Sequence, residues 1–371
     1  ARLRGAQRHN ERPVVGLEIF GEPSDPKYYV WHSEDRAGVD IRTVFPSRSG
    51  EGLPLARRGI RRAVCRQLER IAPALLIVTG YSEYCMRVAA KWARREGVPR
   101  VLLSSTTAWD RHRHFPTEKL KGGWLRRHYQ AAFTSGSRSA AYLEGLGFPS
   151  DSIWQGYGVV DNEAFSAGVA AWRERVKGRG AAQDRRRFLF VGRLAPEKNI
   201  SLLLQAYSLY RRAEDPSPWG LTVVGDGPMR DELQREAARL RLDDVEWAGF
   251  RSGSGLHECY ARAGALVLPS LSEPWGLVVN EALASGLQVL VSNRCGCVPE
   301  LVRTGETGYV FDPNDAGQLA DRMAHIHSGG IGSAVLATSA RRLLSQYSPD
   351  AWGQTLASCA ATVLEEGSTA T

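Results

Sequence analysis

Short apolar runs alternate along this chain with longer segments whose apolar residues recur at helical spacing. Such runs are typical of buried strands, and the longer segments are typical of helices that cover a sheet. In the first half the pattern predicts strands at 14–20, 74–80, 98–105 and 131–136, and helices at 57–70, 83–96 and 137–147. In the second half it predicts strands at 187–192, 221–225, 244–250, 265–270, 288–293 and 307–313, and helices that begin at 199, 228 and 276. This alternation indicates the α/β class, with parallel sheets wrapped by helices.

Two such series predict two domains, which a length of 371 residues also favours. We expect an N-terminal domain at 1–165, a polar linker at 166–186 and a C-terminal domain at 187–347. A further helix is predicted at 348–367. Because ligands of paired α/β domains bind where strand ends face a cleft, we expect the functional site between the two domains.

The composition excludes several classes of protein. Hydrophobic residues make up 43% and charged residues 24%, which is ordinary for a soluble globular chain. No apolar stretch reaches the roughly 20 residues that a membrane-spanning helix needs, and the first residues lack the apolar core of a secretion signal. The six cysteines are few and scattered. We therefore expect a cytoplasmic protein without a disulfide framework.

The positive charge is confined to the first half of the chain. Residues 1–165 contain 26 Lys and Arg against 17 Asp and Glu, whereas the remainder contains 22 against 23. Such a basic half suits an anionic substrate or the inner face of a membrane, so peripheral membrane association is one reading. The other reading is a solvated, arginine-rich surface. No nucleic-acid recognition motif is present, so we do not expect nucleic acid as a partner.

Candidate chemistry begins with two loops that follow predicted strands. Gly192 ends the first strand of the second half, and Arg193 and Lys198 follow before a helix. Two cations at a helix N-terminus suit a diphosphate, although alone they are equally typical of a solvent-exposed loop. Gly225 and Gly227 follow the next strand, where glycines permit a close approach of the backbone to a ligand or simply a turn.

The third loop, SEPWGLVVNEALASG, carries the strongest signal. Glu273 follows a strand, Trp275, Gly276 and Leu277 lead into a helix, and Glu281 lies in that helix. At 1.5 Å rise per residue, Glu281 lies roughly 8 Å along the helix from Gly276, so the two carboxylates reach different parts of one ligand. The backbone N–H groups of 275–277 point toward a phosphate placed there. The alternative is a helix cap at Glu273 and an exposed Glu281.

Together these loops resemble the retaining glycosyltransferases of family four, which have the GT-B fold of two Rossmann-like domains facing across a cleft. The resemblance covers nearly all of residues 187–313. It implies that Arg193 and Lys198 hold the diphosphate and take part in catalysis. It also implies that Glu273 contacts hydroxyls of the donor sugar and that Glu281 contacts the ribose.

The resemblance has further implications for the rest of the chain. Phe250 and Arg251 stand where the family binds the nucleotide base, and the helix at 348–367 is expected to pack back on an acceptor-binding N-terminal domain. The family uses no catalytic metal, so we expect neither metal nor cofactor, only the nucleotide-diphosphate sugar as co-substrate.

The N-terminal half departs from the family pattern in two places. Many relatives carry a histidine after an N-terminal strand, where this chain has Ser105, Thr106 and Thr107. Thr106 and Asp110 are the candidate acceptor-side residues, and Asp110 either orients an acceptor hydroxyl or caps a turn. His112 and His114 are too few ligands for a metal site. Residues 1–9 resemble the helix after the family's first strand, so we expect that strand to be missing; the alternative is a divergent N-terminus. Whether this chain is active depends on which of the two applies.

The most direct reading is a bacterial, retaining, metal-independent glycosyltransferase that moves a sugar from a UDP- or GDP-sugar to an acceptor hydroxyl. The acceptor is a glycan such as a growing polysaccharide, a glycolipid or a small molecule. Two alternatives remain: a sugar-nucleotide epimerase of the same fold, and a non-catalytic sugar-nucleotide-binding protein.

Overall fold

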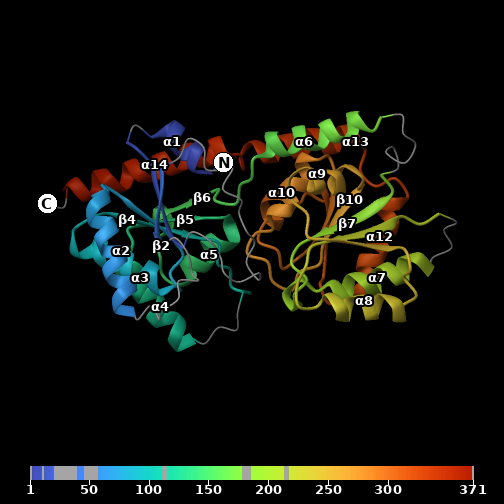
Figure 1. Cartoon of the computed structure of the whole chain (residues 1–371), viewed down its shortest axis with the longest axis horizontal. Coiled ribbons are helices and arrows are strands. Elements are labelled where there is room, and N and C mark those ends of the chain that lie inside the picture. The colour runs from blue at the N-terminus through green and yellow to red at the C-terminus, as the bar shows by residue number, and fades with distance from the viewer. Residues whose placement is uncertain are drawn as a thin grey trace.

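Three parallel sheets organise the part of the chain that the computed structural model describes. That part comprises residues 2–10, 12–20, 40–45, 57–110, 115–177, 185–212 and 217–369. One sheet pairs β1 (Val15–Phe20) with β2 (Asp40–Phe45), and a second has the order β3-β4-β5-β6. The third has six strands in the order β12-β11-β10-β7-β8-β9. The sheets lie in two α/β halves arranged side by side (Figure 1).

The N-terminal half alternates strands and helices as the sequence predicts. Its remaining elements are α1 (Arg2–His9), α2 (Arg57–Ile71), β3 (Leu76–Thr79), α3 (Tyr84–Arg95), β4 (Arg100–Ser104), α4 (Phe115–His128), β5 (Ala131–Thr134), α5 (Ser137–Gly145) and β6 (Ile153–Gln155). Every strand predicted in this half is present, each slightly shorter than the apolar run that predicts it. The sequence analysis missed β2, α4 and β6, because β2 and α4 are too polar and β6 is too short to show a clear period.

The C-terminal half contains every strand that the apolar runs predict. Its strands are β7 (Arg187–Val191), β8 (Gly220–Val224), β9 (Val245–Gly249), β10 (Ala265–Leu268), β11 (Gln288–Ser292) and β12 (Gly308–Phe311). Its helices are α7 (Ile200–Arg212), α8 (Arg230–Arg239), α9 (Gly253–Ala261), α10 (Leu277–Ala284), α11 (Val298–Leu301), α12 (Ala316–His327) and α13 (Ser333–Ser345). All neighbouring strands run parallel, so their carboxyl ends meet at one edge of the sheet.

The stretch 166–186, which the sequence predicts to be a polar linker, begins within a helix. Helix α6 (Asn162–Arg175) occupies its first ten residues and packs against α9 and α10. Asp161 caps the helix by accepting a hydrogen bond from the backbone of Ala164, and Trp172 is buried. The helix gives no clear pattern in the sequence because, among the described residues of this stretch, only Val169 and Trp172 are buried.

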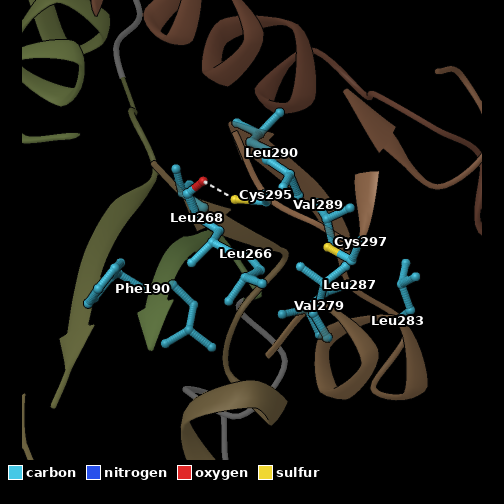
Figure 2. Packing of buried hydrophobic residues seen from close by; sticks show 14 of the residues in the cluster. Phe190, Leu266, Leu268, Val279, Leu283, Leu287, Val289, Leu290, Cys295 and Cys297 are labelled. Atoms are coloured by element: carbon cyan, nitrogen blue, oxygen red, sulfur yellow. Dashed lines mark hydrogen bonds between the residues drawn. The ribbon is translucent and has the colours of Figure 1, made fainter. Parts of the chain in front are cut away.

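The C-terminal half is built around an apolar core between its sheet and helices. Figure 2 shows part of this cluster, in which Leu266 of β10 lies between Phe190 of β7 on one side and Val279 and Leu283 of α10 on the other. Burial of each such side chain stabilises the fold by roughly 1.5–3 kcal/mol. This core fixes β7, β10 and α10 relative to one another, and these are the elements whose ends carry the candidate donor residues.

Helix α14 (Pro349–Thr369) packs against α1, β5 and β6 of the N-terminal half (Figure 1). Glycines allow α1 and α14 to approach closely, since a Cβ on Gly5 would lie 2.0 Å from the backbone oxygen of Pro349. Trp352 of α14 stacks on Phe133 of β5, with ring centroids 6.0 Å apart. The end of the chain therefore returns across the first half.

Candidate active site

Two glycines bring the exits of β7 and β8 into direct backbone contact. Gly225 has a φ of +135°, and a Cβ at this position would lie 1.8 Å from the carbonyl oxygen of Gly192. The N–H of Gly192 donates to Val224, and the N–H of Gly225 donates to Gly249 at the exit of β9. No residue with a side chain fits at Gly225 without moving the backbone. The two strand exits thus lie backbone against backbone, with Gly192 partly exposed and Gly225 buried, and this contact is called the glycine surface below.

Lys198 and Glu273 form an ion pair beside this surface. Lys198 ends a short 3₁₀ turn after β7, and Glu273 lies in the loop after β10. The two side chains are 19% and 14% exposed. A Cβ on Gly192 would lie 3.9 Å from Cε of Lys198. The predicted cation and the predicted sugar-binding acid therefore meet in one place, although they are 75 residues apart in sequence.

The N-terminus of α10 follows directly after Glu273. Gly276, its N-cap, has a φ of +101°, a conformation that side-chain-bearing residues rarely adopt. A Cβ there would lie 2.9 Å from Leu268 and 3.4 Å from Cγ of Glu273. The first N–H groups of a helix, here from Leu277 onward, have no partners within the helix and attract anions. The loop therefore places an acid and an anion-attracting helix end side by side.

Arg193 lies in the same loop as Lys198 and is partly buried. Its neighbour Leu194 is fixed on both sides, because its N–H donates to Asp226 and its carbonyl accepts from Met229. Within the described ranges, the guanidinium of Arg193 makes no hydrogen bond or ion pair. It thus differs from Lys198, whose ammonium group contacts Glu273, and its donors are available to an anionic ligand.

Glu281 is a partly buried acid rather than the exposed residue of the alternative reading. The hydroxyl of Tyr260 on α9 donates to its Oε2 over 2.7 Å. Burial raises the pKa of Glu281 to about 7, and the hydrogen bond from Tyr260 opposes this rise. Tyr260 itself is fully buried. The carboxyl group is therefore held in one orientation by a rigid neighbour.

The side chain of Trp275 packs against the N-terminal half. It is 4% exposed, and Cβ atoms on Gly136 and Gly158 of the N-terminal half would lie 2.7 and 2.3 Å from its ring. Its Nε1 donates to Asn280, whose side-chain nitrogen donates to the carbonyl of Gly158. The indole thus ties the two halves together, and only the backbone of Trp275 is left for a donor.

The candidate base-binding residues follow β9. Phe250 is 48% exposed, and Arg251 is also exposed. They come directly after Gly249, which accepts the hydrogen bond from Gly225. The structure therefore places them on the β9 side of the glycine surface, whereas Lys198 and Glu273 lie on its β7 and β10 side.

The candidate acceptor-side residues lie in the loop after β4. Both carboxylate oxygens of Asp110 accept hydrogen bonds from Thr107, one from its N–H and one from its hydroxyl, each over 2.7 Å. Asp110 therefore caps this turn, as one of the two readings predicts. The hydroxyl of Thr106 accepts from Tyr81 over 3.4 Å. His112 and His114 lie outside the described residues.

The described residues contain no group of three or more His, Cys, Asp and Glu side chains placed to hold a metal ion. In the same part of the chain, no helix is both long and apolar enough to cross a membrane. All six cysteines are free thiols.

Sequence reasoning missed several residues that shape the site. Tyr260 and Asn280 orient Glu281 and Trp275, and Arg138 and Glu300 bind across the two halves. Only Asn280 carried a signal, because it directly precedes Glu281 and interrupts an apolar helix. The others act through contacts between segments far apart in sequence, which no local pattern marks.

Comparison with known proteins finds similarity to glycosyltransferases. Residues 173–342 match the family model described as glycosyl transferases group 1. The sulfoquinovosyl transferase SQD2 of Arabidopsis thaliana is 27% identical over 191 residues, which is 51% of this chain and 36% of the relative. Glycogen synthase of Mycobacterium tuberculosis is 32% identical over 210 residues, or 56% of this chain and 49% of the relative. The matches thus span less than half of these relatives.

Solved structures share the fold over most of the chain. HepE of Anabaena, solved in complex with UDP-glucose, has a TM-score of 0.68 at 17% identity and covers 87% of this chain and 86% of its own. Sucrose-phosphate synthase of Thermosynechococcus elongatus has a TM-score of 0.70 at 18% identity, with coverages of 98% and 92%. At this identity the likeness establishes the fold alone. The chain therefore has the GT-B fold, and its residues 173–342 match the model of the glycosyl transferases group 1 family.

Proposed function

We propose that this protein is a retaining glycosyltransferase that transfers a sugar from a nucleotide-diphosphate sugar to an acceptor hydroxyl without a metal ion. The observation that carries the proposal is the meeting of Lys198 and Glu273 beside the bare backbone of Gly192 and Gly225 and the N-terminus of α10. This arrangement offers a cation and backbone donors for phosphate, and an acid for sugar hydroxyls, within one small region.

The chemistry follows from where charge develops. When the bond between the sugar C1 and the phosphate oxygen breaks, negative charge grows on the departing diphosphate. Arg193, Lys198 and the first N–H groups of α10 stabilise this charge, which is the largest contribution expected from such a site. Glu273 accepts hydrogen bonds from hydroxyls of the sugar, and Glu281 accepts them from the ribose. Phe250 and Arg251 contact the base.

Retention of configuration requires either an enzymic nucleophile or attack from the face that the diphosphate leaves. Glu273 is the candidate acid nearest the sugar and is paired with Lys198, which reduces its nucleophilicity. We therefore propose same-face attack, in which the acceptor oxygen bonds to C1 and its proton passes to the departing phosphate oxygen. The acceptor approaches from the N-terminal half, where Thr106 and Asp110 lie.

The complex of HepE with UDP-glucose supports a UDP-sugar as donor, and GDP-sugars are the second choice. The acceptor is a glycan, a glycolipid or a small molecule. An excess of positive charge in residues 1–165 favours an acceptor at the cytoplasmic face of a membrane.

Release of UDP from UDP-glucose, and of GDP from GDP-mannose, tests this proposal. Replacing Arg193 or Lys198 by Ala should lower turnover by about 10²-fold, as expected for the loss of one donor to a developing anion. Arg235→Ala on the exposed face of α8 is the control and should leave turnover unchanged. Turnover like that of the wild type in both site variants would refute the assignment, and interconversion of the donor sugar without release of nucleotide would identify an epimerase instead.

A further inference from the structure

Arg138 reaches from the first turn of α5 into the C-terminal half. Its Nη1 donates to the carbonyl oxygens of Asn293 over 2.8 Å and Cys295 over 2.6 Å. Burial lowers the pKa of this guanidinium, because removing a charge from water is unfavourable. The hydrogen bonds to the two carbonyl groups offset this cost. Both carbonyls belong to the turn that follows β11, and Figure 2 shows Cys295 of this turn next to Leu268 at the end of β10.

The same turn fixes the backbone of Glu273. The N–H of Glu273 donates to Arg294 over 3.4 Å, and the N–H of Gly296 donates to Glu273 over 2.8 Å. Gly296 is pressed against the loop, since a Cβ there would lie 1.9 Å from the carbonyl oxygen of Pro274. The position of Glu273 therefore depends on the position of residues 293–296, which Arg138 holds from the opposite half.

The other face of Arg138 contacts the acceptor-side loop. Its guanidinium lies 4.7 Å from the ring centroid of Trp109, and Arg294 lies 5.7 Å from the same ring. Trp109 directly precedes Asp110, which caps the turn at Thr107. One cation thus touches the loop of the candidate acceptor-side residues and the turn that is hydrogen-bonded to the backbone of Glu273.

We propose that Arg138 is a positioning residue that couples the acceptor-side loop at Thr106–Asp110 to the sugar-binding position of Glu273. The proposal rests on the proposed function. The contacts of Arg138 exist only while the two halves adjoin, so the backbone of Glu273 is fully supported only in that arrangement. A planar guanidinium stacks on an indole and donates to carbonyls at its edge at the same time, which a lysine ammonium does not.

A matched control distinguishes Arg138 from an arginine that only stabilises the fold. Burial also lowers the pKa of Arg185, and this residue also donates to two carbonyl oxygens, those of Ala263 and Gly286. These carbonyls lie two residues before the first residues of β10 and β11, so they are at the sheet edge opposite the candidate site. Arg185→Ala removes a comparable set of bonds without touching Glu273.

Two measurements test the proposal, with Arg138→Ala, Arg138→Lys and Arg185→Ala compared with the wild type. The first is hydrogen–deuterium exchange of the Gly296 amide without any ligand, which should be at least about fivefold faster in both Arg138 variants and unchanged in Arg185→Ala. The second is turnover of UDP-glucose against the affinity for UDP measured by calorimetry. In Arg138→Ala, turnover should fall by about tenfold while the Kd for UDP stays within about threefold.

Unchanged exchange at Gly296 in Arg138→Ala would overturn the proposal, as would an increase in the Kd for UDP equal to the fall in turnover. The exchange measurement needs no sugar nucleotide, so its result stands whether or not the proposed reaction occurs. If Arg193→Ala and Lys198→Ala retain full turnover, the proposed function fails, whereas the exchange data still test the coupling through Arg138.

Discussion

Replacing Glu281 by Gln should change how the stability of this protein depends on pH. Burial raises the pKa of Glu281 from its ordinary value of 4.5 to about 7 in the folded protein. Below pH 4.5 the carboxyl group is protonated in the folded and unfolded states alike and has no effect. As the pH rises toward 7, the unfolded chain releases its proton first, so the folded state loses stability over this window. Glutamine keeps the size of the side chain and cannot ionise.

The size of the effect follows from the two pKa values. A rise from 4.5 to about 7 corresponds to a loss of about 3 kcal/mol that is complete above pH 7. Between pH 5 and pH 8, the free energy of unfolding of Glu281→Gln should therefore gain about 2 kcal/mol or more relative to the wild type. Tyr260 donates to Glu281, and its hydroxyl can also donate to the amide oxygen of glutamine, so this bond does not have to be lost.

The assay is urea denaturation at pH 5, 6, 7 and 8, followed by circular dichroism. The difference between variant and wild type removes the contributions of other titrating groups, including His128 and His257, whose pKa values are lowered by burial. Glu232→Gln, an exposed position in the first turn of α8, is the control and should show no such trend. Parallel curves for Glu281→Gln and the wild type would show that Glu281 is ionised in the folded protein and would refute the reasoning.

Two further substitutions test the glycine surface and the turn at Asp110. Gly225→Ala should abolish UDP binding in calorimetry and lower the melting temperature far more than the control Gly253→Ala. Both glycines have positive φ, but only a Cβ at Gly225 would clash, at 1.8 Å from the carbonyl oxygen of Gly192. Equal losses in the two variants would show that backbone strain alone matters. Asp110→Ala should reduce the free energy of unfolding by about 1 kcal/mol, because the cap on the turn at Thr107 is lost, while turnover stays within about threefold of the wild type. A fall in turnover of about 10²-fold at unchanged stability would instead give Asp110 a direct role in binding the acceptor.

The sequence by itself determined the fold class and the loops that carry the candidate donor residues. The strands of the large sheet are mostly short apolar runs bounded by glycine or polar residues, and this pattern is local. Gly192, Lys198, Glu273 and Gly276 follow such strands, and the carboxyl ends of parallel strands must share one edge of a sheet. Their proximity therefore follows from the amino-acid sequence alone. Helix α6 was hidden because its burial involves only a few apolar residues, such as Val169 and Trp172.

Only the tertiary structure decided what each of these side chains contacts. Trp275 has the sequence position of a donor-binding residue, yet it fills the space left by Gly136 and Gly158 of the other half. The sequence is equally compatible with an exposed Glu281, whereas the fold places Tyr260 of α9 beside it. Arg138 has no recognisable motif, although it binds the turn that holds Glu273. The period of apolar residues in a sequence shows which face of an element is buried. Which neighbour packs on that face depends on how the two halves pack together, and local sequence preferences carry no information about that packing.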